Sequence, residues 1–368
     1  MKKYSRVFYI FMALIILIST GCSTAPTTEA ANQQPAADAA QPAADSGDAN
    51  ADGGLVYYLA PSLSDEFQAG TNKLMIQYGT EMGYKVKALN AGNKAPLQIN
   101  QMDDAINQKP KAIILNAVDV STITSSVEKA RAAGIPVIVF DRFIQNTQTD
   151  FHSVMGTIKL GQIAAGEIAR LLKEKNGSEK GTVLEVMGDS GDSYTVMIDQ
   201  GFMDEMKKYP DIKVVSKTTP GYEITTTANI VDDQLTANQN KLDIIFIHSD
   251  SRIPAIIPVL QAHNLNKGDV IVVGTDGAPT GLQSIRDGWA LETVGVPLDE
   301  QIYAVWQFMG DVIAKKSFTD GTVKVKSIEA EMKLEEWGPT LYLPGQIVDN
   351  NNVEDPANWG NMKVDLVN

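Results

Sequence analysis

Polar side chains stand at the carboxyl ends of apolar runs along much of this chain. In VIVFDR, residues 137–142, four apolar residues lead directly into an acid and a base, Asp141 and Arg142. Carboxylates accept hydrogen bonds and a guanidinium donates several, so this pair suits a ligand that carries many hydroxyl groups. The candidate ligand-binding residues found in this way are Asp65, Phe67, Asn116, Asp141, Arg142, Asp192, Tyr194, Tyr222, Ser249, Asp250 and Asp276.

The chemistry of this set is non-covalent recognition. Carboxylates accept a hydrogen bond from a hydroxyl, Arg142 and Asn116 donate to its oxygen, and aromatic rings cover apolar C–H faces. A buried carboxylate is costly alone, so we expect the adjacent Asp141 and Arg142 to keep each other ionised. Any one of the candidates could instead be a helix cap or a turn former. The recurrence of the pattern at successive strand ends favours a ligand site.

Catalytic and metal-binding signatures fail in this sequence. GDSGDS (188–193) lacks the glycine that follows the serine-protease motif, and a triad would need one of the chain's 3 histidines beside it. GTDGAPTG (274–281) lacks the spacing of a phosphate-binding loop. DNNNVEDPANWG (349–360) has Glu354 where a calcium loop needs glycine. We therefore expect no catalytic residue, no metal and no cofactor, and so no enzyme.

The elements that must position the candidates alternate along the chain. Short apolar runs predict β-strands, and segments with a helical spacing of apolar residues lie between them. Runs that are apolar throughout suit strands covered on both faces, and helical connections make neighbouring strands parallel. Ser64 and Thr157 are candidate helix caps. The predicted strands are 55–60, 85–89, 112–116, 137–140, 182–187, 213–217, 243–248, 270–274 and 291–296.

This alternation occurs twice with similar spacing. A chain of 368 residues also exceeds what one hydrophobic core usually serves. The predicted fold class is therefore α/β, with two doubly wound parallel-sheet lobes of Rossmann-like type. Ligands of such sheets bind outside the carboxyl ends of the strands, where the candidate residues lie. Residues 340–361 are punctuated by Pro and Gly and are predicted to be extended and non-helical.

The N-terminal segment predicts export. Basic residues precede an apolar run at 7–18 that is too short to span a bilayer and has the length of a signal-peptide core. ISTGC follows and resembles the lipobox of bacterial lipoproteins, with Ser19 where that pattern usually has Leu. We predict a signal peptide at 1–21, acylation of Cys22 and a disordered tether at 22–54; the alternative is an unmodified apolar segment.

The net charge and the cysteine content exclude some classes of partner and of covalent cross-link. The formal charge of −14 argues against nucleic acid, whose phosphates require clustered Lys and Arg. Cys22 is the only cysteine, so a disulfide within the chain is impossible. We expect a monomer.

Several segments resemble a known family when they are taken in order. They are the lipobox, the linker, LAPSLSDEF (59–67), VIVFDR, VVGTDG (272–277) and NNNVEDPANWG (350–360). This succession is similar to the type I periplasmic sugar-binding proteins, which are the ribose, xylose and galactose receptors of ABC importers. The resemblance covers nearly all of residues 55–368.

The resemblance implies roles for individual residues. Asp141, Arg142 and, from the second lobe, Asp276 would bind ring hydroxyls, while Phe67 and Tyr222 would flank the sugar. It also implies a hinge of three chain crossings between an N-terminal lobe, 55–156 plus 297–343, and a C-terminal lobe, 157–296 plus 344–368. The lobes would close over a monosaccharide, and the closed form would dock on an ABC sugar permease outside the cytoplasm.

Departures from the family pattern bear on the sugar. Val196 stands where the ribose receptors carry arginine, Ser249 replaces an expected asparagine, and the region around Val296 lacks the usual Gln or Lys. These departures remove donors, which argues against ribose and fits a smaller, deoxygenated or otherwise altered ligand. The segment NIVDDQLTANQNKLDIIF (229–246) resembles the xylose receptors, so we expect a pentose, a hexose or a related polyol that is xylose-like rather than ribose. The alternative function is that of a receptor that presents its ligand to a chemotaxis system, a sensor kinase or a quorum-signal uptake system.

Overall fold

A computed structural model describes residues 45–46 and 53–362 of the chain. The predicted signal peptide, Cys22 and most of the predicted tether lie outside the described residues, as do residues 363–368. Within the predicted tether, Asp45–Ser46 forms a two-residue strand, β1, which pairs antiparallel with β3 (Tyr84–Asn90). The described fold then continues from strand β2, which begins at Gly54.

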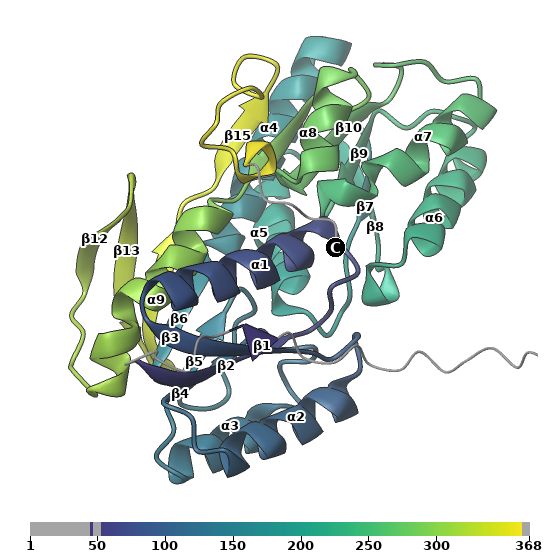
Figure 1. The fold of residues 1–368 in the computed structure, drawn as a ribbon. Helices are drawn as coiled ribbons and strands as arrows, with labels where there is room; N and C mark the ends of the chain where they lie inside the picture. Colours follow the sequence, from purple (N-terminus) through teal and green to yellow (C-terminus); the bar gives the residue numbers. More distant parts are fainter. Residues whose placement is uncertain (1–44, 47–52, 363–368) are drawn as a thin grey trace, which may run out of the picture. The chain divides into compact units, whose positions relative to one another are not determined.

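The larger sheet belongs to the first lobe. Its order is β1-β3-β2-β4-β5-β6-β14-β13-β12 (Figure 1). Neighbours from β3 to β14 are parallel, whereas β12 and β13 continue the sheet as an antiparallel hairpin. Besides β1 and β3, the strands of this sheet are β2 (Gly54–Ala60), β4 (Ala112–Leu115), β5 (Val137–Phe140), β6 (Phe151–Met155), β12 (Gly321–Val325), β13 (Ile328–Glu335) and β14 (Gly338–Leu343).

The smaller sheet belongs to the second lobe and has the order β15-β11-β10-β9-β7-β8. All its pairs are parallel except that between β15 and β11. Its strands are β7 (Gly181–Val186), β8 (Ile212–Lys217), β9 (Ile244–Ile247), β10 (Ile271–Asp276), β11 (Glu292–Gly295) and β15 (Gln346–Asp349).

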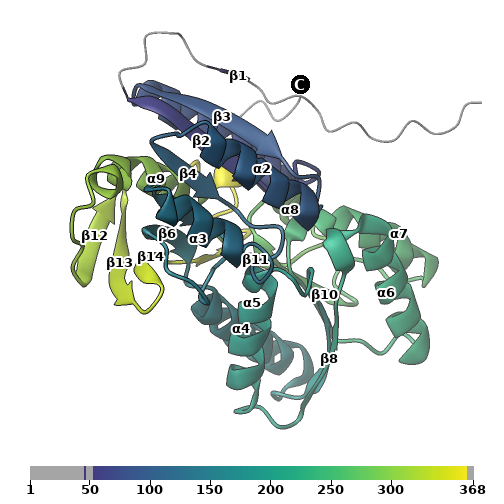
Figure 2. The same ribbon diagram turned by 90° about the horizontal axis from the view of Figure 1, so that it is seen from below.

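Helices cover both faces of each sheet (Figures 1 and 2). In the first lobe these are α1 (Glu66–Glu81) and α9 (Leu298–Ile313) on one face, and α2 (Ala95–Asn107) and α3 (Thr124–Ala132) on the other. In the second lobe they are α4 (Thr157–Asn176) and α5 (Ser193–Met206) on one face, and α6 (Ile224–Ala237), α7 (Ile253–Ala262) and α8 (Pro279–Arg286) on the other. Short 3-10 turns are η1 (Pro220–Tyr222), η2 (Asp250–Arg252) and η3 (Trp359–Asn361). Among the residues that the structure describes, no helix combines the length and the apolarity that crossing a bilayer requires.

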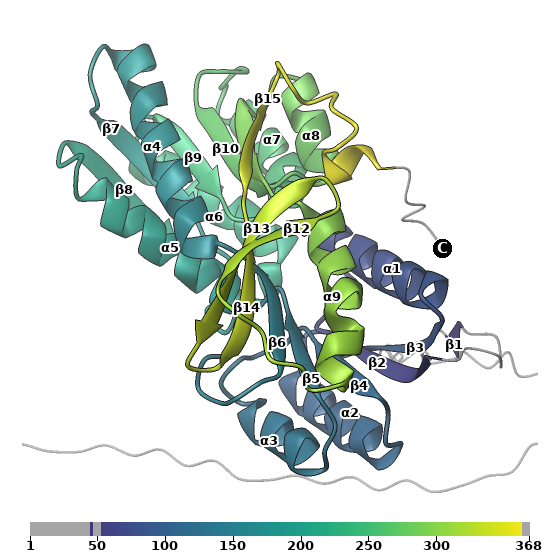
Figure 3. The same cartoon turned by 90° about the vertical axis from the view of Figure 1, so that its left-hand side faces the viewer.

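The predicted fold class, α/β with two doubly wound lobes, is confirmed. The chain passes between the two sheets after β6, after β11 and after β14 (Figure 3). The exact lobe boundaries given above remain a prediction. The sheets are mixed rather than wholly parallel, because β12, β13 and β15 add antiparallel strands at their edges.

Local details differ from the sequence expectations. The N-cap of α1 is Asp65 rather than Ser64, and its side chain accepts a hydrogen bond from the Gln68 N–H at 2.8 Å. Helix α4 starts at Thr157, but its N-cap is Gly156. Strand β6 was not predicted, and neither was the hairpin of β12 and β13. The extended tail contains β15 and ends in the one-turn helix η3.

The cores follow from the burial of the central strands. AIIL of β4, VIVF of β5 and IIFI of β9 are buried at every position, as fully covered parallel strands require. Each such Val, Leu, Ile or Phe side chain stabilises the fold by about 1.5–3 kcal/mol relative to an exposed one. These rigid strands hold the loops that follow their carboxyl ends.

Helices α4 and α5 approach each other closely because glycine lies at their contact. A Cβ atom on Gly161 would overlap the Ile198 carbonyl oxygen, and one on Gly201 would overlap the Ile158 carbonyl oxygen. Backbone therefore packs on backbone here, with no side chain between the helices. This contact fixes α5, whose first turn carries Tyr194.

We predict that Gly161→Ala lowers the free energy of unfolding by about 1–3 kcal/mol, because the added methyl group has to push α4 away from α5. Gly166→Ala is the matched control, since Gly166 lies on the same helix with open space around its Cβ position. That change should raise stability by about 0.5–1 kcal/mol through helix propensity. Urea denaturation of both variants checks the pair, and equal effects of the two would contradict the close packing.

Candidate functional site

The carboxyl ends of strands from both sheets converge on one cavity of about 330 Å³. This is the place where open parallel sheets bind ligands. The predicted residues that line it are Asp65, Phe67, Asp141, Arg142, Asp192, Tyr194, Tyr222, Ser249 and Asp276. The structure therefore brings together side chains that are more than 200 positions apart in the sequence.

Asn116 and Asp250 do not line the cavity. Asn116 lies behind Asp141, and its amide nitrogen is 3.3 Å from the Asp141 Oδ2 and 3.2 Å from the Gln68 Oε1. Both of these hydrogen bonds are donated by Asn116, and the residue is fully buried. In this structure it orients Asp141.

Asp250 builds the turn that follows Asp276. Its two carboxylate oxygens accept hydrogen bonds from the backbone N–H of Gly277 at 2.8 Å and of Ala278 at 3.1 Å, and Oδ2 also accepts from the Thr293 hydroxyl at 2.8 Å. A buried acid saturated with donors in this way has no oxygen directed at the cavity lining. The turn that it holds carries Asp276.

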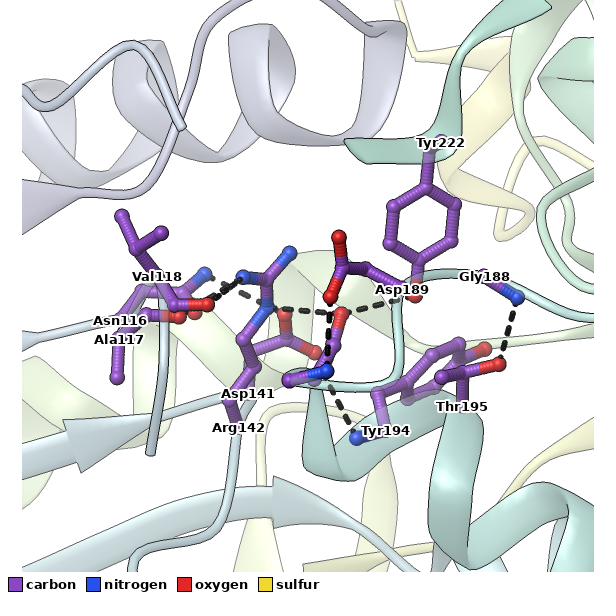
Figure 4. Close-up of polar contacts among 12 residues, drawn as sticks. Asn116, Ala117, Val118, Asp141, Arg142, Gly188, Asp189, Tyr194, Thr195 and Tyr222 are labelled. Atoms are coloured by element: carbon purple, nitrogen blue, oxygen red, sulfur yellow. Dashed lines mark hydrogen bonds and ion pairs between the residues drawn. The ribbon is translucent and has the colours of Figure 1, made fainter. Parts of the chain in front are cut away.

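Arg142 connects the two lobes. Its Nε lies 2.9 Å from the Asp192 Oδ2, and both side chains are almost fully buried. Its Nη1 donates to the carbonyl oxygen of Ala117 at 2.8 Å, and Asp192 also accepts from the Tyr222 hydroxyl at 2.8 Å. Figure 4 shows the guanidinium between the 116–118 segment and Tyr222.

The expected pairing of Asp141 with Arg142 is therefore corrected. Adjacent residues at a strand end point in different directions, so the ion pair of Arg142 forms with Asp192 of the other lobe. Arg142 acts on Asp141 only through its charge, which lowers the pKa of that carboxyl. Asp141 remains free to accept hydrogen bonds from a ligand.

Burial governs the electrostatics of the cavity. Loss of water raises the pKa of Asp141 to about 7, and the nearby charge of Asp192 adds to this rise. Burial likewise raises the pKa of Asp65 to about 6, against the hydrogen bond from the Gln68 N–H. It also raises the pKa of Asp276. Buried carboxylates with raised pKa values gain most from a ligand that donates hydrogen bonds to them.

Two aromatic side chains of the second lobe donate hydrogen bonds to Asp276. The Tyr194 hydroxyl donates to the Asp276 Oδ1 at 2.5 Å, and the Trp359 indole N–H donates to the Asp276 carbonyl oxygen at 2.6 Å. Trp359 in turn packs edge-to-face on Phe67 of the first lobe, with ring centroids 5.9 Å apart. One network therefore runs from Asp276 to an aromatic side chain of the opposite lobe.

The backbone at the cavity is strained. Asp141, Tyr222, Ser249 and Asp276 have φ values of 66°, 57°, 76° and 100°, in a region that residues other than glycine seldom adopt. Each such conformation costs about 1–3 kcal/mol and persists only where the surroundings impose it. Four residues that line one cavity share this feature, which supports a functional role for their orientation.

Sequence reasoning missed several lining residues. The most informative is Arg252, which is 3% exposed and follows Asp250 by two positions in the turn η2. Its Nη1 donates to the Thr227 hydroxyl at 3.0 Å, and its guanidinium carbon lies 5.1 Å from the centre of the Tyr222 ring. Burial lowers the pKa of Arg252 to about 10. The other missed lining residues are Ser64, Glu66, Gln68, Gly221, Glu223, Ile224, Ser251 and Thr280.

A weak signal for these residues existed in the sequence. Most of them lie within a few positions of a predicted one, in PSLSDEFQ, PGYEI and HSDSR. Inspection of each strand end over a longer segment would have included them. Thr280 lies four positions after Asp276 in GTDGAPTG, at the start of the helix α8 that was not predicted.

The histidines lie away from the cavity lining. His152 is buried, and burial lowers its pKa to about 3. His248 is buried against Thr195 and Glu185, while His263 contacts Asn240 and Asp232. Within the described ranges, no group of three or more His, Cys, Asp or Glu side chains is arranged to hold a metal ion.

We predict that Asp141 and Asp65 lower the stability of the ligand-free protein as the pH rises from about 4 to about 7, whereas buried His152, with its pKa lowered to about 3, contributes in the opposite direction. Asp141 and Asp65 have higher pKa values in the folded chain than in the unfolded one, so the folded state binds more protons in this window. Asp141→Asn should flatten the slope, because it removes the group with the larger rise. Thermal unfolding of the wild type and of Asp141→Asn across this pH range measures the two slopes, and equal slopes would contradict the assignment.

Comparison with known proteins assigns the family. The family model described as periplasmic binding protein domain matches residues 56–317, which is more than half of the chain. The D-apiose import binding protein of Actinobacillus succinogenes is 28% identical over 64% of this chain and 74% of that protein. The ribose import binding protein RbsB of Bacillus subtilis is 26% identical over 74% of this chain and 84% of its own length.

A solved structure shares the fold. It is a carbohydrate transporter solute binding protein from Agrobacterium radiobacter in complex with D-arabinose, with a TM-score of 0.71 at 21% identity; the match covers 83% of this chain and 97% of that one. The resemblance found in the sequence is thereby confirmed, as is the expectation of a binding protein rather than an enzyme. The cavity at the strand ends and the matched family model agree: this chain belongs to the type I periplasmic binding proteins, in the family of sugar receptors that serve ABC importers.

Proposed function

We propose that the chain captures one uncharged monosaccharide or polyol between its lobes and delivers it to an ABC sugar permease. The observation that supports this most is the composition of the cavity, in which buried carboxylates and guanidinium groups from both lobes surround a small volume. A volume of about 330 Å³ is at the lower end of ordinary ligand pockets, which suits a single sugar ring.

The binding roles follow from hydrogen-bond chemistry. Asp65, Asp141 and Asp276 accept from ligand hydroxyl groups, and Arg142 donates to a ligand oxygen. Burial makes each of these charge-assisted bonds stronger than a neutral one. Tyr222 and Phe67 supply the apolar surface for the C–H faces of the ring.

The energetics require no covalent step. A micromolar dissociation constant corresponds to about −8 kcal/mol. Spread over the roughly 10–12 heavy atoms of a monosaccharide, this is about 0.7 kcal/mol per atom, within the range for small ligands. A dense set of hydrogen bonds can supply that affinity.

The sugar that we propose is xylose-like rather than ribose itself. Support comes from the departures in the sequence, of which Ser249 lines the cavity. Val196 is 44% exposed on α5 and Val296 is buried outside the lining, so neither supplies a donor to the ligand. Arg252, which does line the cavity, offers a guanidinium in the second lobe.

We also propose that Cys22 is acylated and tethers the protein to the outer face of a membrane through residues 22–54. The support is the sequence pattern around Cys22, since these positions lie outside the described residues. Two acyl chains or more would give stable anchoring, because each buried methylene contributes about 0.8 kcal/mol. The protein would act as a monomer on the extracytoplasmic side.

We predict that Asp141→Ala abolishes sugar binding while the fold is retained. The carboxylate is fully buried in the cavity and is oriented by Asn116, so its loss removes an acceptor that no neighbour replaces. A thermal-shift screen with D-apiose, D-xylose, D-ribose, D-arabinose, xylitol and myo-inositol identifies the ligand, and calorimetry then compares the variants. Asp104→Ala, an exposed acid of the same lobe, is the control. Unchanged affinity of Asp141→Ala, or no shift with any compound, would contradict the proposal.

We further predict that Cys22→Ser moves the mature protein from the membrane fraction to the soluble fraction. The serine hydroxyl cannot take the thioether-linked lipid, so the hydrophobic attachment is lost. Cell fractionation followed by immunoblotting measures the distribution. A variant that stays in the membrane pellet would argue for the unmodified apolar segment as the anchor.

A further inference from the structure

Glu66 of the first lobe lines the cavity and also contacts the second lobe directly. Its Oε2 accepts hydrogen bonds from the Thr280 backbone N–H at 3.0 Å and from the Thr280 hydroxyl at 2.7 Å. Glu66 is the first residue of α1, whereas Thr280 lies in the first turn of α8. The two positions are 214 residues apart in the chain.

This contact caps a helix from outside its own lobe. The first backbone N–H groups of a helix have no partner within it, and α8 begins after Ala278, which offers no side-chain cap. Asp250 satisfies the N–H groups of Gly277 and Ala278 from within the second lobe. The N–H of Thr280 instead depends on Glu66 and would face water if the lobes separated.

Electrostatics favour the same contact. Helix N-termini carry partial positive charge, and Glu66 stands at the N-terminus of α1 while it contacts the N-terminus of α8. One carboxylate therefore interacts with two helix ends that would otherwise repel each other. Both residues are partly shielded from water, which limits screening.

We propose that Glu66 is a latch that holds the two lobes together before a ligand binds, and so sets the fraction of protein in the closed arrangement. This inference rests on the proposed capture of a ligand between the lobes. Because Asp65 and Phe67 flank Glu66 and line the cavity, a ligand that orders this turn also orders the latch. Weakening the latch reduces the closed fraction and lowers the apparent affinity by the same factor at most.

The test measures the distance between the lobes in the ligand-free full chain. Spin labels on Asp104→Cys in α2 and Thr236→Cys in α6, both exposed, report this distance by pulsed electron resonance, with Cys22→Ser so that only the labels react. Glu66→Ala should lower the ratio of closed to open protein by about tenfold, which is the scale of a hydrogen bond to a charged group. Glu66→Gln should have a smaller effect, because its amide oxygen still accepts.

Two further variants separate the latch from general damage to α1. Glu81→Gln changes the same residue type at the other end of α1, where it contacts only Gln77 among the described hydrogen bonds, and should leave the distances unchanged. Thr280→Val removes the hydroxyl donor and should shift the ratio in the same direction. Added to Glu66→Ala it should cause no further shift, because both changes remove one interaction.

These measurements test the latch even if the bound sugar is not known. Two results would overturn the latch. The first is an equal ratio of closed to open protein in the ligand-free wild type and in Glu66→Ala. The second is that the effects of Glu66→Ala and Thr280→Val on this ratio add up in the double variant. If the latch holds but none of the sugars of the screen binds, the proposed function fails and the latch stands. Where a sugar binds, its dissociation from Glu66→Ala should be faster by up to about tenfold, which stopped-flow measurement records.

Discussion

The burial of several carboxylates in one small cavity is the constraint on which the rest of this molecule depends. Burial raises the pKa of Asp141, Asp276 and Asp65, so each of these carboxylates gains from a ligand that donates hydrogen bonds to it. Asp192 forms an ion pair with Arg142. This lining suits compounds with many hydroxyl groups, because these donate hydrogen bonds to several carboxylates at once without adding negative charge.

The buried acids of the cavity come from both lobes of the fold. Within one lobe, each strand end supplies its own side chain at a fixed place, as Asp141 does after β5. Cross-lobe contacts, such as Arg142 with Asp192, exist only when the lobes meet. Rigid strands and the close contact of α4 with α5 keep each half of the cavity intact, so the variable quantity is the distance between the halves.

Much of this architecture could be predicted from the sequence because its signals are local. Runs such as VIVF and IIFI are apolar throughout, and the polar residues after them mark the ligand edge of a parallel sheet. Strand β13 also carried a readable signal, since Ala330 and Met332 alternate with exposed Glu329 and Glu331. Strand β6 carried none, because its buried His152 and Ser153 resemble a loop and because one of its two partners, β14, lies far away in the sequence.

Side-chain partners were harder to predict than strand ends. Proximity in sequence favoured Asp141 as the partner of Arg142, yet the direction in which each side chain leaves the backbone decides the contact. Asp250 was predicted to bind the ligand together with Ser249, but it accepts hydrogen bonds from two backbone N–H groups of the turn after β10 and from the Thr293 hydroxyl of β11. Such outcomes depend on the packing of elements far apart in the chain, which no short window of sequence contains.

The position of Trp359 gives this protein a natural optical reporter. Its indole donates to the backbone of Asp276 and lies against the ring of Phe67, so it contacts both sides of the cavity. None of the four tryptophans, at 289, 306, 337 and 359, is among the cavity-lining residues, and Trp359 is the one that contacts Phe67 and Asp276. Emission from one native fluorophore thus senses whether the two sides are in contact, and occupancy can be followed with no dye attached to the chain.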